Sequence, residues 1–231
     1  MDRRGDLNGW WYFGLVVVGF FARLVFRIRV AGAEQTPPAG PGIVAGNHVS
    51  ALDGIVLSLT TAEHARRMTR FLVAAEFFEK KKVAWALRLY RQISLNRGKA
   101  DAGALDEAVA TIRSGAVAGI FPEGKVNPDP DGGLQRGRRG VGRIALATGA
   151  PVVPVGIWGT QDRWPKAGLH YRRPWLRTIA VVYGEPIEPR GDAESLEDAQ
   201  VFTDLVMNGI AKQVAEARTL AETGTLPSPR R

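Results

Sequence analysis

One of only three histidines in the sequence, His48, stands five positions before a carboxylate, Asp53, and directly after a short apolar run. Histidine accepts a proton near neutral pH, and a nearby aspartate can fix the tautomer of its ring and stabilise the imidazolium that forms. On a continuous helix this spacing turns the two side chains away from each other, so they can meet only if a turn separates them. The pair therefore predicts general-base chemistry, with His48 in a loop and Asp53 near the start of a helix.

The residues around this pair have the composition that such a geometry needs. Residues 42–46 predict a short strand, and residues 54–59 predict the apolar start of a helix. In α/β proteins, functional side chains collect where strands end. A His-x-x-x-x-Asp spacing taken alone arises by coincidence more often than by function, so other segments must support it.

Two further segments place charged side chains at the ends of expected strands, where they could converge on His48. Residues 93–97 end in Arg97, and the planar guanidinium of arginine suits a phosphate. Residues 121–124 carry Glu123 on a Pro/Gly turn, where its carboxylate could orient a substrate hydroxyl or pair with Arg97. Each segment also has an ordinary interpretation: Arg97 could be a surface charge, and residues 121–124 could be a simple strand-to-loop turn.

Several other motifs are absent or incomplete. Residues 140–145 fit a dinucleotide-binding G-x-G-x-x-A pattern, but arginines rather than a strand precede them. Residues 127–132 resemble the start of a calcium loop, but Arg138 stands where a bidentate glutamate is needed. The sequence contains no cysteine and no G-x-S-x-G, and the other two histidines have no metal-like spacing to His48. We therefore expect no metal site, no thiol nucleophile and no resident cofactor.

The chain has the length and composition of one folded domain. With 231 residues, 45% of them hydrophobic, it can form one α/β domain and is too short to need two. Strand-like and helix-like segments alternate, which predicts a mixed, largely parallel sheet flanked by helices. Pro154 falls inside an expected strand and predicts a sheet edge, a bulge or the mouth of a site. We expect strands at residues 42–46, 71–74, 92–95, 116–121, 152–158 and 179–183, and helices at residues 76–91, from a cap at Asp101 to a stop at Gly115, at residues 140–148 and from Ser195 onward.

The charge of the chain suggests an anionic partner. The formal net charge is +8 and the pI is near 10.2. Between residues 63 and 99 ten basic residues face three acids, whereas from residue 185 onward nine acids face five basic residues. A phospholipid surface, a phosphorylated substrate or a nucleic acid could supply the anion. Nucleic acid is disfavoured, because the aromatic residues gather in an apolar N-terminal segment instead of alternating with basic residues on a strand.

Residues 1–35 are expected to associate with a membrane. Within them, residues 10–22 form an apolar run of thirteen, with tryptophans at one end and arginines on both sides. A helix needs ~20 apolar residues to cross a bilayer, but a shorter one can lie at headgroup level. A buried N-terminal helix and a cleaved signal peptide are the alternatives, and no small-residue cleavage site follows the run. We expect the folded domain to span residues 36–222 and residues 223–231 to be disordered.

Taken in order, four blocks resemble the motifs of the glycerolipid acyltransferases, and most closely the 1-acylglycerol-3-phosphate acyltransferases. The blocks are residues 47–53, 93–97, 121–124 and 152–155. The resemblance implies direct transfer of a fatty acyl group from acyl-CoA or acyl carrier protein to the free hydroxyl of a lysophospholipid. We accordingly expect a membrane-associated protein on the cytoplasmic face, bound at the interface of a bilayer that contains anionic lipids.

The resemblance also implies a role for the residues of these blocks. His48 acts as the general base and Asp53 orients it, an effect worth roughly 10²–10⁴-fold in rate. Arg97 binds the phosphate of the acceptor, while Glu123 and Gly124 shape the pocket for its glycerol.

Two residues depart from the family pattern. Lys125 stands where the family often has threonine or serine followed by arginine, and Arg138 stands in place of a later lysine. Both keep a positive charge, so we expect them to support phosphate binding. Four residues complete the motifs without an assigned chemical role: Asn47, Phe121, Pro122 and Pro154.

Two alternatives remain open at the level of the sequence. The same chemistry could act on another lysolipid acceptor, such as a lyso-ornithine lipid, a glycolipid or another lysophospholipid. The chain could also be a non-catalytic basic protein that binds lipid surfaces, but that function explains the charge without explaining His48, Asp53 and Glu123.

Overall fold

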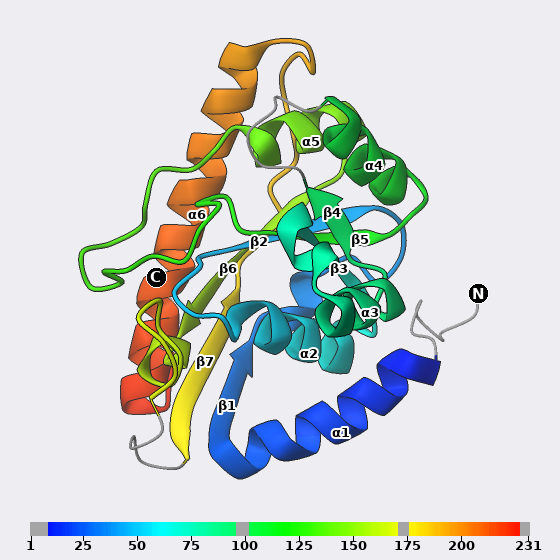
Figure 1. Ribbon diagram of the computed structural model, residues 1–231. Helices are drawn as coiled ribbons and strands as arrows, with labels where there is room; N and C mark the ends of the chain where they lie inside the picture. The colour runs from blue at the N-terminus through cyan, green and yellow to red at the C-terminus, as the bar shows by residue number, and fades with distance from the viewer. Residues whose placement is uncertain (1–8, 96–101, 171–175, 227–231) are drawn as a thin grey trace.

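A computed structural model describes residues 9–95, 102–170 and 176–226. Its strands are β1 (Phe26–Ala31), β2 (Gly42–Gly46), β3 (Thr69–Ala74), β4 (Ile93–Leu95), β5 (Val117–Ile120), β6 (Val152–Trp158) and β7 (Arg177–Tyr183). They form one seven-stranded sheet in the order β1-β7-β6-β2-β5-β3-β4 (Figure 1). Strands β2 to β6 run parallel to one another, whereas β7 is antiparallel to β6 and β1 is parallel to β7. The expected mixed, largely parallel sheet is confirmed.

Helices flank both faces of this sheet. The α-helices are α1 (Gly9–Val25), α2 (Asp53–Ala65), α3 (Lys81–Leu89), α4 (Ala102–Arg113), α5 (Gly140–Thr148) and α6 (Leu196–Thr223). Three 3₁₀ turns join them: η1 (Ala33–Gln35), η2 (Ala75–Glu79) and η3 (Thr160–Asp162). Helices α4, α5 and α6 cover one face, and α2 covers the other with α1 packed against it (Figure 1).

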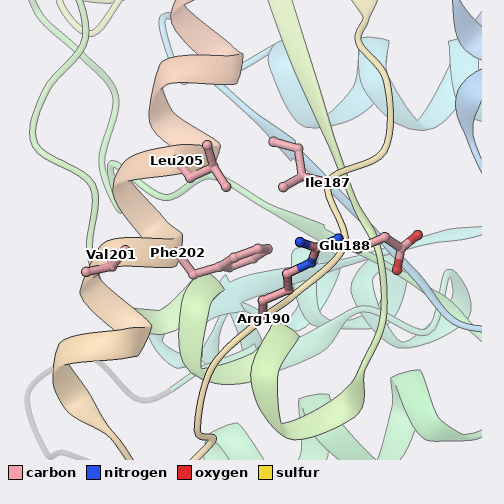
Figure 2. A pocket seen from close by; sticks show the side chains of 6 residues that line it. All are labelled: Ile187, Glu188, Arg190, Val201, Phe202 and Leu205. Carbon is pink, nitrogen blue, oxygen red and sulfur yellow. The ribbon is translucent and has the colours of Figure 1, made fainter.

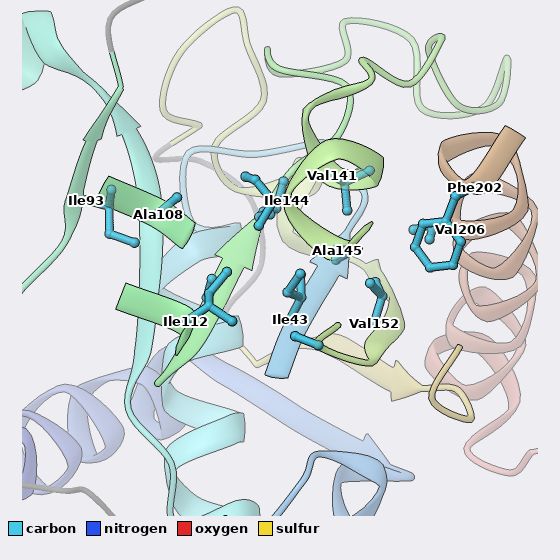
Figure 3. Packing of buried hydrophobic residues seen from close by; sticks show 14 of the residues in the cluster. Ile43, Ile93, Ala108, Ile112, Val141, Ile144, Ala145, Val152, Phe202 and Val206 are labelled. Atoms are coloured by element: carbon cyan, nitrogen blue, oxygen red, sulfur yellow. The ribbon is translucent and has the colours of Figure 1, made fainter. Parts of the chain in front are cut away.

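The buried residues of the strands alternate between these two layers. Ile43 of β2 packs with Ile144 and Phe202 beneath α5 and α6 (Figure 3). The next residue, Val44, packs with Leu57 of α2 on the other face. A parallel sheet that is covered on both faces needs apolar residues at consecutive positions. This explains why residues 42–46 have no polar side chain, and it leaves the loop after β2 as the first place for polar chemistry.

Tyr183 at the end of β7 fixes α2 against the sheet. Its hydroxyl lies 2.7 Å from Thr60 Oγ1 and 2.9 Å from Thr61 Oγ1, and both threonines are fully buried residues of α2. Burial raises the pKa of Tyr183 to about 12, so the phenol stays neutral. Because α2 begins at Asp53, these contacts also set where Asp53 lies.

Two expected elements differ from the structure. The helix expected at residues 76–91 is divided into η2 and α3 by Lys80, whose backbone is extended and whose carbonyl accepts a hydrogen bond from Ala84 at the start of the new helix. Strand β1 lies inside residues 1–35, so part of the expected membrane segment is built into the sheet. The expected cap Asp101 and residues 227–231 of the expected tail lie outside the described residues.

The position of Pro154 decides between the sheet edge and the bulge that the sequence left open. Strand β6 is not an edge, because it lies between β7 and β2. Val155 pairs with Tyr183 and Val152 with Ile187, so three steps along β6 correspond to four along its partner. This extra residue is a bulge next to Pro154, whose carbonyl accepts a hydrogen bond from Gly184 N–H. The missing N–H faces this irregular pairing, so the proline costs no regular ladder bond.

The described helices include none with both the length and the apolar character that crossing a bilayer requires.

Gly156 provides a test of how closely α6 packs on the sheet. A Cβ at this residue of β6 would collide with the main chain of Gln213 on α6, whereas a Cβ at Gly140 would meet no atom within 4 Å. We expect Gly156→Ala to lower the free energy of unfolding by about 3 kcal/mol, because the helix must shift. Gly140→Ala should leave it unchanged or raise it by up to about 1 kcal/mol. Urea unfolding of both variants measures this, and equal stabilities would contradict the close packing.

Candidate active site

His48 and Asp53 meet across the loop between β2 and α2. His48 Nδ1 lies 3.0 Å from Asp53 Oδ2, and the His48 side chain is 19% exposed while that of Asp53 is fully buried. Asp53 is the first residue of α2, so the loop provides the turn that the spacing requires. Because a carboxylate accepts, the ring proton lies on Nδ1, and Nε2 keeps its lone pair for another proton.

The buried carboxylate of Asp53 organises the whole loop. Oδ2 also accepts hydrogen bonds from the backbone N–H groups of Val49 and Ser50, each at 2.7 Å. The other oxygen, Oδ1, accepts a hydrogen bond of 2.6 Å from the hydroxyl of Thr160, which is itself fully buried. Neither oxygen can rotate away without breaking several bonds, so the ring of His48 is held in one orientation.

Glu123 holds the main chain of His48. Its Oε1 accepts a hydrogen bond of 2.8 Å from His48 N–H, and its Oε2 accepts one of 2.9 Å from Gln135 N–H. The carbonyl of His48 in turn accepts a hydrogen bond of 2.6 Å from Asn127 N–H. Glu123 is only 2% exposed, so the structure gives its carboxylate a positioning role. The contact with a substrate hydroxyl or with Arg97 that the sequence offers for this carboxylate stays a prediction.

The remaining motif residues support the loop from the strands. Asn47 joins the end of β2 to β6, because its side chain donates to the carbonyl of Ile157 at 2.9 Å and accepts from Ile157 N–H at 2.8 Å. Phe121 stacks on the His48 ring with centroids 4.3 Å apart and an interplanar angle of 10°. Phe71 stacks on the other side of Phe121, with centroids 5.2 Å apart. Aromatic surface thus covers one face of the imidazole.

The basic residues expected at this site have different placements. Arg138 lies against Gly124, since a Cβ on Gly124 would be 2.6 Å from Arg138 Nε, and Arg138 N–H donates to the Pro122 carbonyl at 2.8 Å. Gly124 has a φ of 71°, which a glycine adopts without strain. Lys125 is exposed. Arg97 lies outside the described residues, so its role stays a prediction.

The turn after β6 is a part of the site that the sequence did not reveal. It supplies Thr160 to Asp53, and its Trp164 carbonyl accepts hydrogen bonds from Ser50 Oγ at 2.7 Å and from Ala51 N–H at 3.3 Å. One signal was present, because Thr160 is a polar residue directly after the carboxyl end of a parallel strand. The motif blocks end before it.

The surface has a small hollow near the loop that carries His48 and a larger one beside α6. A small cavity of about 100 Å³ lies behind the loop, between Asn47 and Val49 on one side and Val214 of α6 on the other. A larger hollow of about 480 Å³ lies between α6 and the segment before it (Figure 2). Its Ile187 pairs with the start of β6, whereas His48 follows the end of the parallel strand β2. The larger hollow therefore lies at the amino end of the parallel strands, whereas His48 lies at their carboxyl end.

Among the described residues, no group of three or more histidine, aspartate or glutamate side chains is placed to hold a metal ion.

A family model described as Acyltransferase matches residues 27–158, more than half of the chain. The chain belongs to this acyltransferase family. His48, Asp53, Glu123 and Pro154 all lie inside the matched residues, and Thr160 lies just beyond them.

Some proteins similar to this chain are named as glycerolipid acyltransferases. An uncharacterized protein of Mycobacterium leprae is 32% identical over 179 residues, which are 74% of this chain and 45% of the relative. A 1-acyl-sn-glycerol-3-phosphate acyltransferase of Borreliella burgdorferi is 29% identical over 140 residues, 59% of this chain and 53% of the relative. The chain thus spans about half the length of these relatives. The crystal structure of the 1-acyl-sn-glycerophosphate (LPA) acyltransferase PlsC from Thermotoga maritima matches with a TM-score of 0.65 and 28% identity, covering 87% of this chain and 77% of that chain.

Thr160 offers a test of the turn after β6 as a positioning element of the acyltransferase. Thr160→Val keeps the shape of the side chain and removes the hydrogen bond to Asp53 Oδ1, so we expect kcat to fall about 10–100-fold because the dyad loses its alignment. Thr160→Ser keeps the hydroxyl and should retain most of the activity. Steady-state kinetics and the thermal midpoint are measured for both. An equal loss in the two variants would contradict this role, because Thr160→Ser keeps the hydroxyl that donates to Asp53.

Glu123 offers a second test, because a positioning role and an acceptor contact predict different kinetics. Glu123→Gln leaves one carbonyl oxygen for the two backbone N–H donors of His48 and Gln135, so one buried donor loses its partner at a cost of about 1–3 kcal/mol. We expect kcat to fall while the KM for the acceptor stays within about twofold. A large rise in KM with an unchanged kcat would return Glu123 to the acceptor pocket.

Proposed function

We propose that the chain transfers a fatty acyl group from acyl-CoA or acyl carrier protein to the free hydroxyl of 1-acyl-glycerol-3-phosphate, giving phosphatidic acid. The observation that carries this proposal is the His48–Asp53 pair with Nε2 left as the proton acceptor. The relatives named as 1-acyl-sn-glycerol-3-phosphate acyltransferases support the choice of acceptor.

The chemistry follows from the arrangement of the pair. Nε2 of His48 takes the proton of the acceptor hydroxyl while that oxygen attacks the thioester carbonyl. The tetrahedral intermediate then collapses, the C–S bond breaks, and the departing sulfur takes the proton from the imidazolium. Asp53 stabilises the imidazolium between these two steps through its 3.0 Å contact with Nδ1. The acyl group passes directly between substrates, so no enzyme nucleophile is needed.

The acceptor phosphate would be held by cations beside this pair. Arg138 packs on Gly124, and Lys125 is exposed on the same turn. Together with Arg97 these residues could neutralise the two charges of a phosphate monoester. The glycerol of the acceptor would then lie over the Gly124 turn.

The protein would work at the interface of a membrane on its cytoplasmic face, with α1 lying on the bilayer. Six large apolar side chains of α1 are each more than half exposed, although α1 packs against α2 on its other side. We call this set the α1 face: Trp10, Phe13, Val16, Phe20, Phe21 and Leu24. Such a surface on one helix is typical of interfacial binding.

A panel of acceptors tests the proposed function. Purified protein is incubated with acyl-CoA or acyl carrier protein and with 1-acyl-glycerol-3-phosphate, lyso-ornithine lipid, a glycolipid and other lysophospholipids, and mass spectrometry identifies the products. We expect phosphatidic acid as the main product and a loss of about 10²–10⁴-fold in His48→Ala. Acylation of a different acceptor alone would overturn the acceptor but keep the chemistry. Transfer to none of them, or full activity of His48→Ala, would overturn the mechanism.

A further inference from the structure

Helix α3 and the turn before it expose an unusual combination of side chains. Phe77, Val83 and Trp85 are large apolar residues on the surface, and Trp85 is 63% exposed. Between them Lys80, Lys81 and Lys82 are all exposed. We call these six residues the α3 patch. Only Ala84 of α3 is buried, so the helix rests on the domain by a narrow contact and leaves its tryptophan in solvent.

The helices that carry the α3 patch and the α1 face pack against each other. Tyr90, at the end of α3, packs edge-on against Trp11 of α1 with ring centroids 5.3 Å apart. Its ring also fills the space above Gly14, where a Cβ would be 2.6 Å from the Tyr90 hydroxyl. The two helices therefore lie next to each other on one side of the molecule (Figure 1).

The distribution of charge matches a negatively charged surface on this side. From residue 75 to residue 91, five basic residues accompany two acids, Glu76 and Glu79, for a net charge of +3. Helix α6 covers the opposite face of the sheet and has five acids against two basic residues, a net charge of −3. An anionic bilayer attracts lysines near its surface by about 1 kcal/mol each and repels acids. The field of the molecule thus turns α3 towards such a bilayer and α6 away from it.

We propose that the α3 patch is a second membrane contact that meets an anionic phospholipid bilayer beside α1. Trp85 and Phe77 lie at the level of the headgroups, where tryptophan is favoured, and the three lysines reach the lipid phosphates. Protein–protein interfaces are depleted in lysine, so this composition suits lipid better than a protein partner. Lys80 also lies 5.4 Å above the Phe77 ring, which keeps the cation and the apolar surface together.

The absence of cysteine from the sequence permits a direct test of this contact. Val83→Cys creates a single labelling site in the α3 patch for an environment-sensitive fluorophore, and Val201→Cys creates a matched site on α6, where the valine is 64% exposed. Each labelled full-length protein is mixed with phosphatidylcholine vesicles with and without phosphatidylglycerol. We expect a blue shift only for the label at position 83, and only with the anionic vesicles. A label at position 83 that stays in water while the protein sediments with vesicles would overturn the proposal.

A pair of charge reversals tests the electrostatic part. Lys81→Glu with Lys82→Glu should weaken binding to the anionic vesicles by about tenfold or more, because at least two lysine contacts are lost. Lys212→Glu with Arg190→Glu makes the same change in net charge away from the α3 patch and should bind nearly as the wild type does. If both double variants lose the same affinity for the vesicles, the effect comes from net charge alone, and the proposed contact is overturned. Unchanged vesicle binding with a raised KM for acyl-CoA would overturn it too, because the patch would then hold the phosphates of the donor.

Vesicle binding is measured without acyl donor or acceptor, so its result is separate from the proposed reaction. Phe20→Ser with Phe21→Ser removes two residues of the α1 face and reports the contribution of α1 alone. If α3 is a second contact, the charge reversals on α3 will lower the affinity of this variant further, and no further loss would contradict the proposal.

Discussion

The loop between β2 and α2, which carries His48, depends on the hydrogen bonds that the carboxylate of Asp53 accepts. It accepts hydrogen bonds from the ring of His48, from the main chain of Val49 and Ser50, and from the hydroxyl of Thr160. A carboxylate that is removed from water must replace every lost water contact with a protein donor. The four donors meet this requirement only in one arrangement of the loop. The contacts that orient His48 therefore belong to the same set that replaces water around Asp53.

Glu123 repeats this principle on the other side of His48. It is almost fully buried and receives N–H groups from two separate segments, at His48 and at Gln135. One acid therefore holds the side chain of the histidine and another holds its backbone. The aromatic stack of Phe121 and Phe71 lies against the ring and allows little motion in the remaining direction. Such over-determination is what a base needs if it must meet a hydroxyl at a fixed position.

What the sequence predicts well is local. The strand, loop and helix around His48 and Asp53 are close in the chain, and the spacing of the two residues already requires a turn. Glu123 bonds to a residue 75 positions away and Thr160 to one 107 positions away, so no local pattern could reveal either contact. Strand β1 was missed for another reason. Its alternating arginines and apolar residues were assigned to the flank of a membrane helix, although that alternation is typical of a strand.

Helix α1 passes into β1 without any connecting residue, since the helix ends at Val25 and the strand begins at Phe26. β1 is paired along its whole length with β7, and β7 is paired with β6. A flexible linker would let the domain swing freely above whatever surface holds α1. Here the helix is a rigid arm of the sheet, so its angle on that surface also determines the height and tilt of the His48 loop. In the proposed membrane-bound state, the distance that a lipid must rise to reach His48 is thus a property of the fold.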